Sequence, residues 1–388
     1  MTAPTPLAAS FPAATEDDWL KAVAKARAGK AAKPSASRVG TTAAAIGLFP
    51  RRTDARVIPG REEQRWRIVQ RIDAGTVAAA SDSIAEAIAN GATGLELAFL
   101  GTGKLLEEDA ATIAKQLAAV ATGRFHVRVE CETLAIAGPF IELAGHLDVA
   151  VAFDPVALAA GGQPQADTLA DRAKTIARAL EARKARGVAV IADGRFWSAA
   201  GATDEDELAI ALATLVSHLR LIEAPDRIGI ALAVGPAQLH GIAKVRAMRL
   251  LLARLWEAGH LMGATPRIHA ETSLRSFKDA DPHMNVIRGT SAAFAAAVGG
   301  ADSITVHPSD SSEAARRLAR NTQLILADEA NLFRVADPSA GSGAIETLTE
   351  ALAEKAWDRF TAIERGGGMT HAISEGALLR EITGANHA

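Results

Sequence analysis

The fold is decided by residues 267–323, which read RIHAETSLRSFKDADPHMNVIRGTSAAFAAAVGGADSITVHPSDSSEAARRLARNTQ. The first seven of them, Arg267–Ser273, alternate apolar and polar side chains, as a strand does. An apolar helical run over 285–298 ends at Gly299-Gly300, a common stop signal for a helix. A second β-branched run, Ser303–His307, follows. A strand, a helix and a strand in this order predict a parallel pair with a right-handed crossover.

The same alternation of short apolar strands and Ala-rich helices runs along most of the chain. Many of the strands read as nearly continuous apolar runs, which is typical of parallel strands buried on both faces. Successive βα units predict an α/β fold, a (β/α)8 TIM barrel rather than an open doubly wound sheet. No Gly-x-Gly-x-x-Gly follows the first strand, which also disfavours the open sheet. The expected strands are Trp66–Asp73, Gly94–Leu100, Phe125–Cys131, Asp148–Asp154, Gly187–Asp193, Ile228–Gly235, Arg267–Ser273 and Ser303–His307.

The two ends of the chain differ from the barrel region. We expect residues 1–60 to form an N-terminal helical arm and linker, and residues 61–388 to form the barrel with a C-terminal helical extension. Thr15-Glu-Asp-Asp18 resembles a capping box, so a helix should begin there. Trp19 and Phe49 have little nearby to pack against. We therefore expect the arm to dock on another subunit; the alternative is a loose tail with one helix.

Composition and charge exclude several classes of protein. Hydrophobic residues make up 49% of the 388, enough for a large core, and the net charge of −3 favours neither nucleic acid nor a membrane surface. Cys131 is the only cysteine, which excludes an intramolecular disulfide and a cysteine-based metal site. The sequence has neither a secretory signal at its start nor an apolar run long enough to span a bilayer. We expect a soluble cytoplasmic protein.

Six short motifs stand out in the second half of the chain. They are His269-Ala-Glu-Thr-Ser, Asp281-Pro, Ala292–Gly300, Ala319-Arg-Asn-Thr-Gln, Asp337-Pro-Ser-Ala-Gly-Ser and Glu354-Lys-Ala-Trp. Together and in this order they resemble motifs of the methylmalonyl-CoA mutase family. That family comprises adenosylcobalamin-dependent acyl-CoA mutases, so the resemblance implies a barrel, an isomerase and a place in propionate metabolism.

The chain departs from the family at the residues that carry the chemistry. Catalytic members have Tyr-Ala-Gly-Phe-Ser-Thr after the first strand, where the Tyr directs the radical rearrangement; this chain has Arg71-Ile-Asp-Ala-Gly-Thr76 and no tyrosine at all. After the fifth strand they have Ser-Gly-Tyr-His, whose His contacts the thioester. Phe196 stands there instead and cannot form that hydrogen bond. Glu271 replaces a family Gln, and the Asn and Glu that hold the adenosyl ribose are missing from Val306–Asp310.

Charged residues lie where a barrel places its catalytic groups, at the C-terminal ends of the strands. They are Asp73, Glu132, Asp154, Asp193, Glu271 and His307. Such groups could bind a divalent metal, or they could be loop residues that keep the barrel soluble. A ring of carboxylates would also repel the phosphates of CoA, unless Arg195, Arg275 and Lys278 offset it.

The strands suggest a closed barrel. Catalytic members line the barrel with Ser and Thr, which leaves a tunnel for the CoA arm. Here three strands contain Val127-Arg-Val129, Val149-Ala-Val151 and Val188-Ala-Val-Ile191. We expect these branched side chains to point inward and fill the tunnel. We expect no catalytic residue and no metal on this chain, only the remains of a pocket formed by His269, Glu271, Asp193 and Arg195.

The resemblance and the departures together imply the small, non-catalytic subunit of a heterodimeric methylmalonyl-CoA mutase. Such a chain would pair with and stabilise a large subunit. No Asp-x-His-x-x-Gly, the loop whose His ligates cobalt in the family, occurs in the sequence. We therefore expect no cofactor on this chain and adenosylcobalamin on the partner. The alternatives are an active substrate-binding subunit of a split B12-dependent acyl-CoA mutase, and a metal-dependent barrel enzyme.

Overall fold

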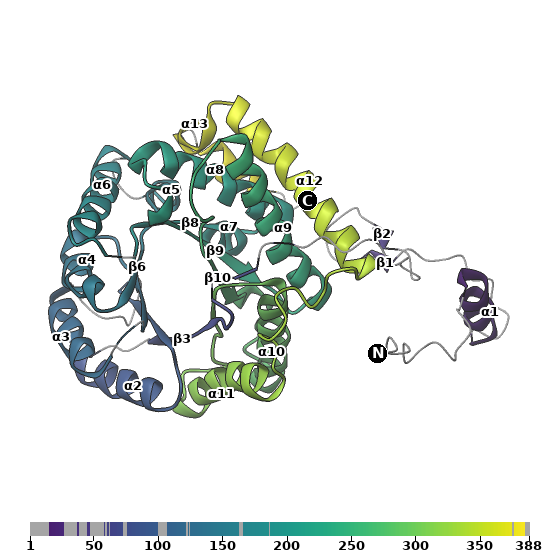
Figure 1. The fold of residues 1–388 in the computed structure, drawn as a ribbon, viewed down its shortest axis with the longest axis horizontal. Coiled ribbons are helices and arrows are strands. Elements are labelled where there is room, and N and C mark those ends of the chain that lie inside the picture. Colours follow the sequence, from purple (N-terminus) through teal and green to yellow (C-terminus); the bar gives the residue numbers. More distant parts are fainter. Residues whose placement is uncertain are drawn as a thin grey trace, which may run out of the picture.

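A computed structural model describes residues 15–26, 37–38, 45–46, 58, 60–61, 63–72, 76–99, 107–121, 123, 125–162, 166–185, 187–374 and 376–384. In this part of the chain nine parallel strands form a barrel surrounded by helices (Figure 1), which confirms the predicted fold. The strands are β3 (Arg67–Ile72), β4 (Gly94–Ala98), β5 (His126–Glu130), β6 (Asp148–Ala152), β7 (Gly187–Val188), β8 (Val190–Asp193), β9 (Ile228–Val234), β10 (Ile268–Thr272) and β11 (Ser303–Thr305).

Helices follow the strands around the outside of the barrel. Several begin at side-chain caps; Thr76, Thr133, Thr203 and Ser312 each accept a hydrogen bond from a backbone N–H of the first turn. The helices are α2 (Val77–Ala89), α3 (Ala110–Val120), α4 (Leu134–Ile141), α5 (Pro155–Ala160), α6 (Ala166–Ala182), α7 (Gly194–Ala200), α8 (Asp204–Ile222), α9 (Gln238–Ala258), α10 (Pro282–Gly299), α11 (Glu313–Leu324), α12 (Gly343–Arg365), α13 (Gly368–Ser374) and α14 (Ala377–Gly384).

The fifth predicted strand closes the barrel, but in two pieces. β7 pairs only with β6, and β8 pairs only with β9. Between the pieces, Ala189 N donates to Arg227 O at 2.7 Å, and within β8 Ile191 N donates to Phe153 O, just after β6, at 3.0 Å. Val188 and Ile191, three positions apart, belong to the same interior cluster. A break in strict alternation of this kind is what a β-bulge produces.

The buried apolar side chains of the described residues form two separate cores. The larger core lies between the strands and the helices, and it includes Val127, Val129, Val149 and Val151 together with helical residues such as Phe140. The smaller lies inside the barrel and consists of Ala150, Ala152, Val188, Ile191 and Ala231.

The prediction that the valines of the third and fourth strands point inward is therefore wrong. Their alternate neighbours face the axis instead, because side chains of a strand alternate between its two sides. Only Val188 and Ile191 of the predicted apolar lining lie inside.

The C-terminal helices pack on the barrel. α12 lies across α8 and α9 (Figure 1). Arg246 of α9, which is 1% exposed, holds α12 and the segment before it against the barrel. Its Nη2 donates to Asp337 Oδ2 at 2.9 Å and to Glu346 Oε1 at 3.0 Å, and its Nη1 donates to Thr349 Oγ1 at 3.2 Å. A guanidinium with several partners can be buried at little net cost.

The N-terminal helix α1 (Glu16–Ala26) lies apart from the barrel in Figure 1. Its predicted capping box is present: Asp18 N donates to Thr15 Oγ1 at 3.2 Å, and Asp18 Oδ2 accepts from Thr15 N at 3.1 Å. A short antiparallel pair, β1 (Ser37–Arg38) and β2 (Ala45–Ile46), follows it. Phe49 lies outside the described residues.

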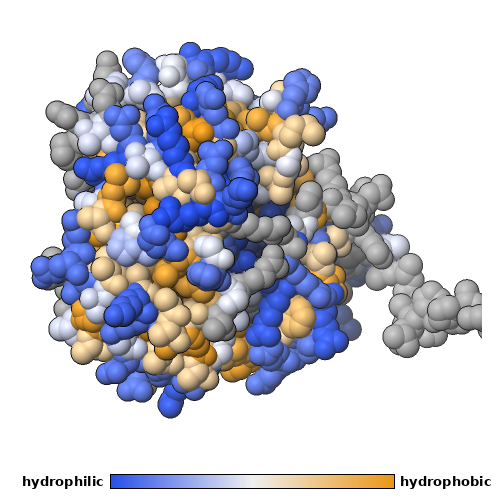
Figure 2. Space-filling model, turned by 60° about the vertical axis from the view of Figure 1, so that its left-hand side comes forward, coloured by the Kyte–Doolittle hydropathy of each residue, from blue (hydrophilic) through white to orange (hydrophobic). Residues whose placement is uncertain are grey.

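The face shown in Figure 2 is a mixture of charged and apolar residues. No helix in the described ranges is long and apolar enough to cross a bilayer.

Candidate functional site

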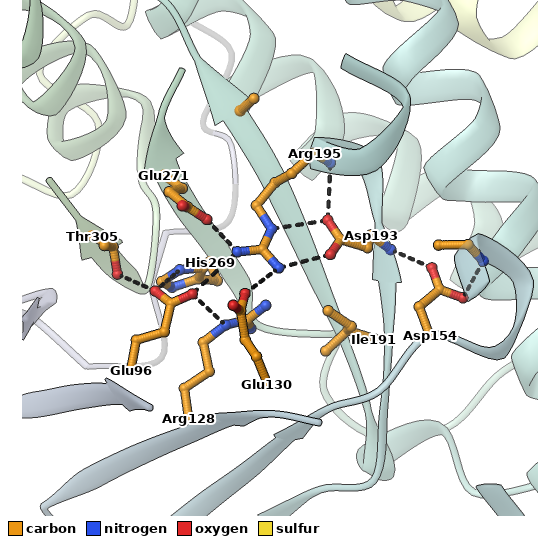
Figure 3. A network of polar contacts seen from close by, with 12 residues as sticks. Glu96, Arg128, Glu130, Asp154, Ile191, Asp193, Arg195, His269, Glu271 and Thr305 are labelled. Carbon is orange, nitrogen blue, oxygen red and sulfur yellow. Dashed lines mark hydrogen bonds and ion pairs between the residues drawn. The ribbon is translucent and has the colours of Figure 1, made fainter. Parts of the chain in front are cut away.

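The inside of the barrel carries a cluster of charged side chains (Figure 3). They come from alternate positions of neighbouring strands, so they converge on the axis. The residues are Arg71 of β3, Glu96 of β4, Arg128 and Glu130 of β5, His269 and Glu271 of β10, and Thr305 of β11. Of these residues, the sequence analysis predicted His269 and Glu271 as pocket residues and missed the others. The signal that could have identified them is the alternation in Gly94-Leu-Glu-Leu-Ala98 and His126-Val-Arg-Val-Glu130.

Arg195 bridges the cluster from the opposite wall. It stands in the first turn of α7, directly after β8, and Asp193 fixes it there. The backbone N and the Nε of Arg195 both donate to Asp193 Oδ1 at 2.9 Å, and its Nη2 donates to Asp193 Oδ2 at 2.7 Å. The guanidinium then reaches Glu96 at 3.2 Å, Glu130 at 2.8 Å and Glu271. Burial alone would lower the pKa of Arg195, but the surrounding carboxylates raise it well above its ordinary value.

Glu96 is the centre of the cluster and is fully buried. It accepts from Arg71 Nη1 at 3.0 Å and from Thr305 Oγ1 at 2.8 Å, in addition to Arg195. Burial favours its neutral form, yet the contact with His269 and the charges of the arginines hold its pKa well below the ordinary value. Glu96 is therefore a permanent anion.

Glu130 has a different environment, although Arg71 Nη1 also donates to it at 2.9 Å. Burial and the neighbouring charge of Glu96 raise the pKa of Glu130. The pKa values of the two carboxylates therefore shift in opposite directions. At Glu96 the contact with His269 and the arginines outweigh burial, whereas at Glu130 burial and the charge of Glu96 outweigh the arginines.

Glu271 and His307 form an ion pair at the mouth of the barrel. Burial would lower the pKa of His307, but the Glu271 carboxylate outweighs that effect and raises it. The pKa of Glu271 is lowered, since the charges of Arg195 and His307 outweigh the effect of burial. His307 N also donates to Thr272 Oγ1 at 2.9 Å, which holds the loop after β11 against β10.

His269 lies one layer deeper than this ion pair. Its Nδ1 is 2.8 Å from Ser303 Oγ, and its Nε2 is 3.7 Å from Glu96 Oε2. Burial and the nearby charge of Arg128 lower the pKa of His269, so its ring is neutral at pH 7. The ring supports the position of Glu96 rather than acting as an acid.

The cluster compensates its own charge. Three guanidinium groups, from Arg71, Arg128 and Arg195, stand among the four carboxylates of Glu96, Glu130, Asp193 and Glu271. A protonated His307 supplies the remaining positive charge. The mouth is therefore not the acidic ring expected from the sequence, because arginines from the barrel wall neutralise it.

A metal could be held only at the expense of this pairing. Glu96, His269 and Glu271 offer ligand atoms within 4.8 Å of one another. However, Arg195 Nη1 contacts both carboxylates. A divalent cation would have to displace a guanidinium that Asp193 holds in place, which disfavours the metal-dependent alternative.

The mouth of the barrel opens into a pocket of about 680 Å³. Of the predicted pocket residues, Asp193, Arg195 and Glu271 line it, whereas His269 does not. Phe196 also lines it and packs edge-on against Trp197, with ring centroids 5.3 Å apart. An aromatic wall thus replaces the hydrogen-bonding His that the family places here.

Other predicted mouth residues have structural roles. Asp154 caps α5, accepting from Val156 N at 2.8 Å, and also accepts from Asp193 N at 2.9 Å. Arg275 Nη1 donates to the carbonyl of Ala202 at 3.2 Å. Glu132 lies outside the charged cluster. The backbone N–H of Lys278 donates to Asn285. Asp73 lies outside the described residues.

The sequence matches the model of a known family over residues 163–388, and that family is described as methylmalonyl-CoA mutase. This chain belongs to the methylmalonyl-CoA mutase family. The matched region contains β7 to β11 and every described helix from α6 onward. It therefore includes Asp193, Arg195, His269, Glu271 and His307 of the charged cluster.

Named relatives point to the same family. A probable methylmalonyl-CoA mutase small subunit from Mycobacterium tuberculosis is 39% identical over 244 residues, which cover 56% of this chain and 40% of that protein. A small subunit from Propionibacterium freudenreichii subsp. shermanii is 34% identical over 264 residues, covering 63% and 40%. A methylmalonyl-CoA mutase from Rhizobium meliloti is 36% identical over 205 residues, covering 49% and 29%.

The matched part is thus at most 40% of the length of these relatives. Among solved structures, a dihydropteroate synthase from Yersinia pestis aligns with 69% of this chain and 99% of its own length, at 14% identity and a TM-score of 0.40. That likeness is too low to bear on function.

Proposed function

We propose that this chain is the small, non-catalytic subunit of a heterodimeric methylmalonyl-CoA mutase, located in the cytoplasm. In this role it pairs with and stabilises an adenosylcobalamin-dependent large subunit, which interconverts methylmalonyl-CoA and succinyl-CoA. The names of the relatives in mycobacteria and Propionibacterium support the subunit role.

The observation that carries the proposal is the position of Arg195. Its guanidinium crosses the axis of the barrel and joins Glu96, Glu130 and Glu271, where catalytic members would leave room for the acyl-CoA arm. Moving it aside would leave buried carboxylates without partners, which costs several kcal/mol. Substrate binding would have to supply that free energy, so the cluster opposes entry of a thioester.

The chemistry that the reaction needs is also missing. The sequence contains no tyrosine, and Phe196 presents an apolar ring to the mouth pocket. A phenyl ring neither donates nor accepts the hydrogen bond that steers a migrating thioester. Among the described residues, every charged group of the cluster already has an oppositely charged neighbour.

Adenosylcobalamin does not fit this mouth, so we assign the cofactor to the partner subunit. The mouth groups pair with one another: Arg71 binds Glu130, Arg195 binds Asp193, and His307 binds Glu271. His307, from the segment after β11 that binds the adenosyl ribose in catalytic members, is turned into the barrel. Among the described residues, the charged groups of the mouth are therefore already paired and are not free to hold a ribose.

Recovery of the chain from its native extract, with mass spectrometry of co-eluting proteins, tests the pairing. We expect one copy of a second mutase-family chain that carries cobalamin, in constant ratio through gel filtration. A chain that elutes alone, or only with copies of itself, would argue against the subunit role. If the co-eluting protein binds B12 but has no barrel of its own, the split-mutase alternative is supported instead.

A further inference from the structure

A second cavity lies inside the barrel below the charged cluster, toward the N-terminal ends of the strands. Its volume is about 30 Å³. Roughly 10–15 Å³ of such space holds one water, so this cavity has room for a group of about two water volumes. It is lined by Glu63, Arg67, His126, Arg128, Ala150, Val188, Ile191, Gly229, Ile230, Arg267, His269, Asp302 and Ser303.

Arg128 has unused hydrogen-bonding capacity in this cavity. The residue is 2% exposed, and among the described residues its Nε and Nη2 have no hydrogen-bond partner. The Nε lies 3.7 Å from Glu96 Oε1, which is an ion pair without a hydrogen bond. In Figure 3 the guanidinium lies behind Glu130, on the side toward Ile191, which also lines the cavity. Buried donors of a charged group that lack partners cost free energy, so this geometry favours an acceptor in the cavity.

The carboxylates around the cavity are already paired. Asp148 accepts from Arg267 at 2.6 Å and pairs with Arg67, and Glu63 accepts from Arg67 at 2.9 Å. Asp302 accepts a backbone N–H at 2.7 Å and also binds an arginine of α9. None of these acceptors reaches the free donors of Arg128. The charge of Arg128 is balanced by Glu96 in the cluster above, but two of its N–H groups still lack an acceptor.

The two histidines of the cavity add no positive charge to it. The pKa of His126 is lowered well below its ordinary value, first by burial and then by the charges of Arg67 and Arg267. The pKa of His269 is lowered by burial and by Arg128. Both rings are therefore neutral and do not compete with Arg128 as cations. His269 Nε2 is itself without a hydrogen-bond partner in the described structure.

We propose that this cavity binds one small monovalent anion, a halide or a single carboxylate group, on the free N–H groups of Arg128, beside His269. Access is from the N-terminal end of the barrel, where a pocket of about 810 Å³ shares Glu63, Arg67 and Arg267 with the cavity. The site is independent of the subunit role and does not involve the mouth pocket.

Crystals of the full chain soaked in sodium bromide test the position. An anomalous bromine peak within hydrogen-bonding distance of the Arg128 guanidinium is expected. Bromide only at the protein surface, with water alone beside Arg128, would overturn the proposal.

Thermal unfolding tests binding in solution. Chloride replaces gluconate, which is too large for the cavity, at constant ionic strength. A ligand that binds only the folded state raises the midpoint, here by about 2 °C when the anion is about tenfold above its dissociation constant. A parallel series in formate shows whether a carboxylate serves as well as a halide. If neither anion shifts the midpoint, a crystallographic peak reflects binding at crystal concentration only, and the proposal fails.

A matched pair of variants tests whether the anion that shifts the unfolding midpoint binds in this cavity. Ala150 lines the cavity and pairs in register with Arg128, whereas Ala152, two residues on and on the same face, does not line it. Ala150→Val fills the cavity without changing any charge, so the anion-dependent shift should disappear. Ala152→Val should keep it. Equal shifts in both variants would place the bound anion elsewhere and overturn the proposal.

Discussion

The two halves of the inner barrel wall differ in chemistry. The wall formed by β3, β4, β5 and β10 carries long charged side chains, including Glu96 and Arg128. The wall formed by β6, β7, β8 and β9 carries mainly small or apolar ones, including Ala150 and Ala231, with Asp148 of β6 and Asp193 of β8 as its charged exceptions. The small residues leave the axis free, and side chains from the charged wall, joined by Arg195 from above, occupy it. The difference explains how one barrel can hold a cluster of charged groups along its axis.

Of the changes considered, removing Arg195 should destabilise the charged half of the barrel wall most. Arg195→Met should destabilise the fold by about 3–5 kcal/mol, because it leaves buried carboxylates without their shared partner. Denaturant unfolding measures the change. Arg220 is the matched control; it binds Glu364 at 2.6 Å but its side chain is 63% exposed, so Arg220→Met should cost less than about 1 kcal/mol. Similar losses in both variants would show that the cluster does not hold the charged wall together.

Adjacent residues of β6 test which side of the wall faces the axis. Val149 lies in the outer apolar core and Ala150 inside the barrel. Val149→Thr should cost about 1–3 kcal/mol, because it buries a hydroxyl among apolar helices. Ala150→Ser should cost less, since polar groups lie nearby. Free energies of unfolding in urea give the ranking, and the reverse order would contradict the observed register.

The Glu271–His307 pair should make the unfolding free energy of the chain depend on pH. The pKa of His307 in the folded chain is raised above the ordinary 6.5. Its stabilising contribution is therefore complete below about pH 6.5 and is lost as the pH rises through the folded value. The difference in unfolding free energy between the parent and His307→Gln should shrink above pH 6.5. A difference that grows with pH would mean that His307 is neutral in the fold.

The smallest effect on the barrel is expected from the N-terminal arm. Deleting residues 1–55 should change the unfolding free energy of the barrel little, yet weaken binding to the large subunit. Trp19 and Leu20 are only partly buried in this chain, and each is worth roughly 1.5–3 kcal/mol when fully removed from water. Calorimetric titration of both forms with the large subunit measures the loss. Equal affinities, or an unfolded truncated chain, would contradict this role.

Much of the fold could be predicted from the sequence. Apolar runs separated by Ala-rich helices identified all the strands that form the barrel, and the capping box at Thr15 located α1. The break at Ala189 could not be predicted, because a bulge depends on which neighbour each half of the strand pairs with. The valines of β5 and β6 were assigned to the wrong side, since a short apolar run does not itself show which face is inward.

The site was predicted less completely. Asp193, Arg195 and Glu271 do meet at the mouth, but nothing in their spacing shows that Arg195 reaches Glu96, which lies 99 residues away along the chain. Such contacts follow only once the barrel has brought the strands together.

Turnover of methylmalonyl-CoA is the most direct test of the central claim that the barrel is not catalytic. The purified chain is assayed with adenosylcobalamin, alone and together with its co-purified large subunit. We predict no succinyl-CoA from the chain alone and turnover from the pair. Production of succinyl-CoA by the isolated chain, above a heat-killed control, would contradict the account.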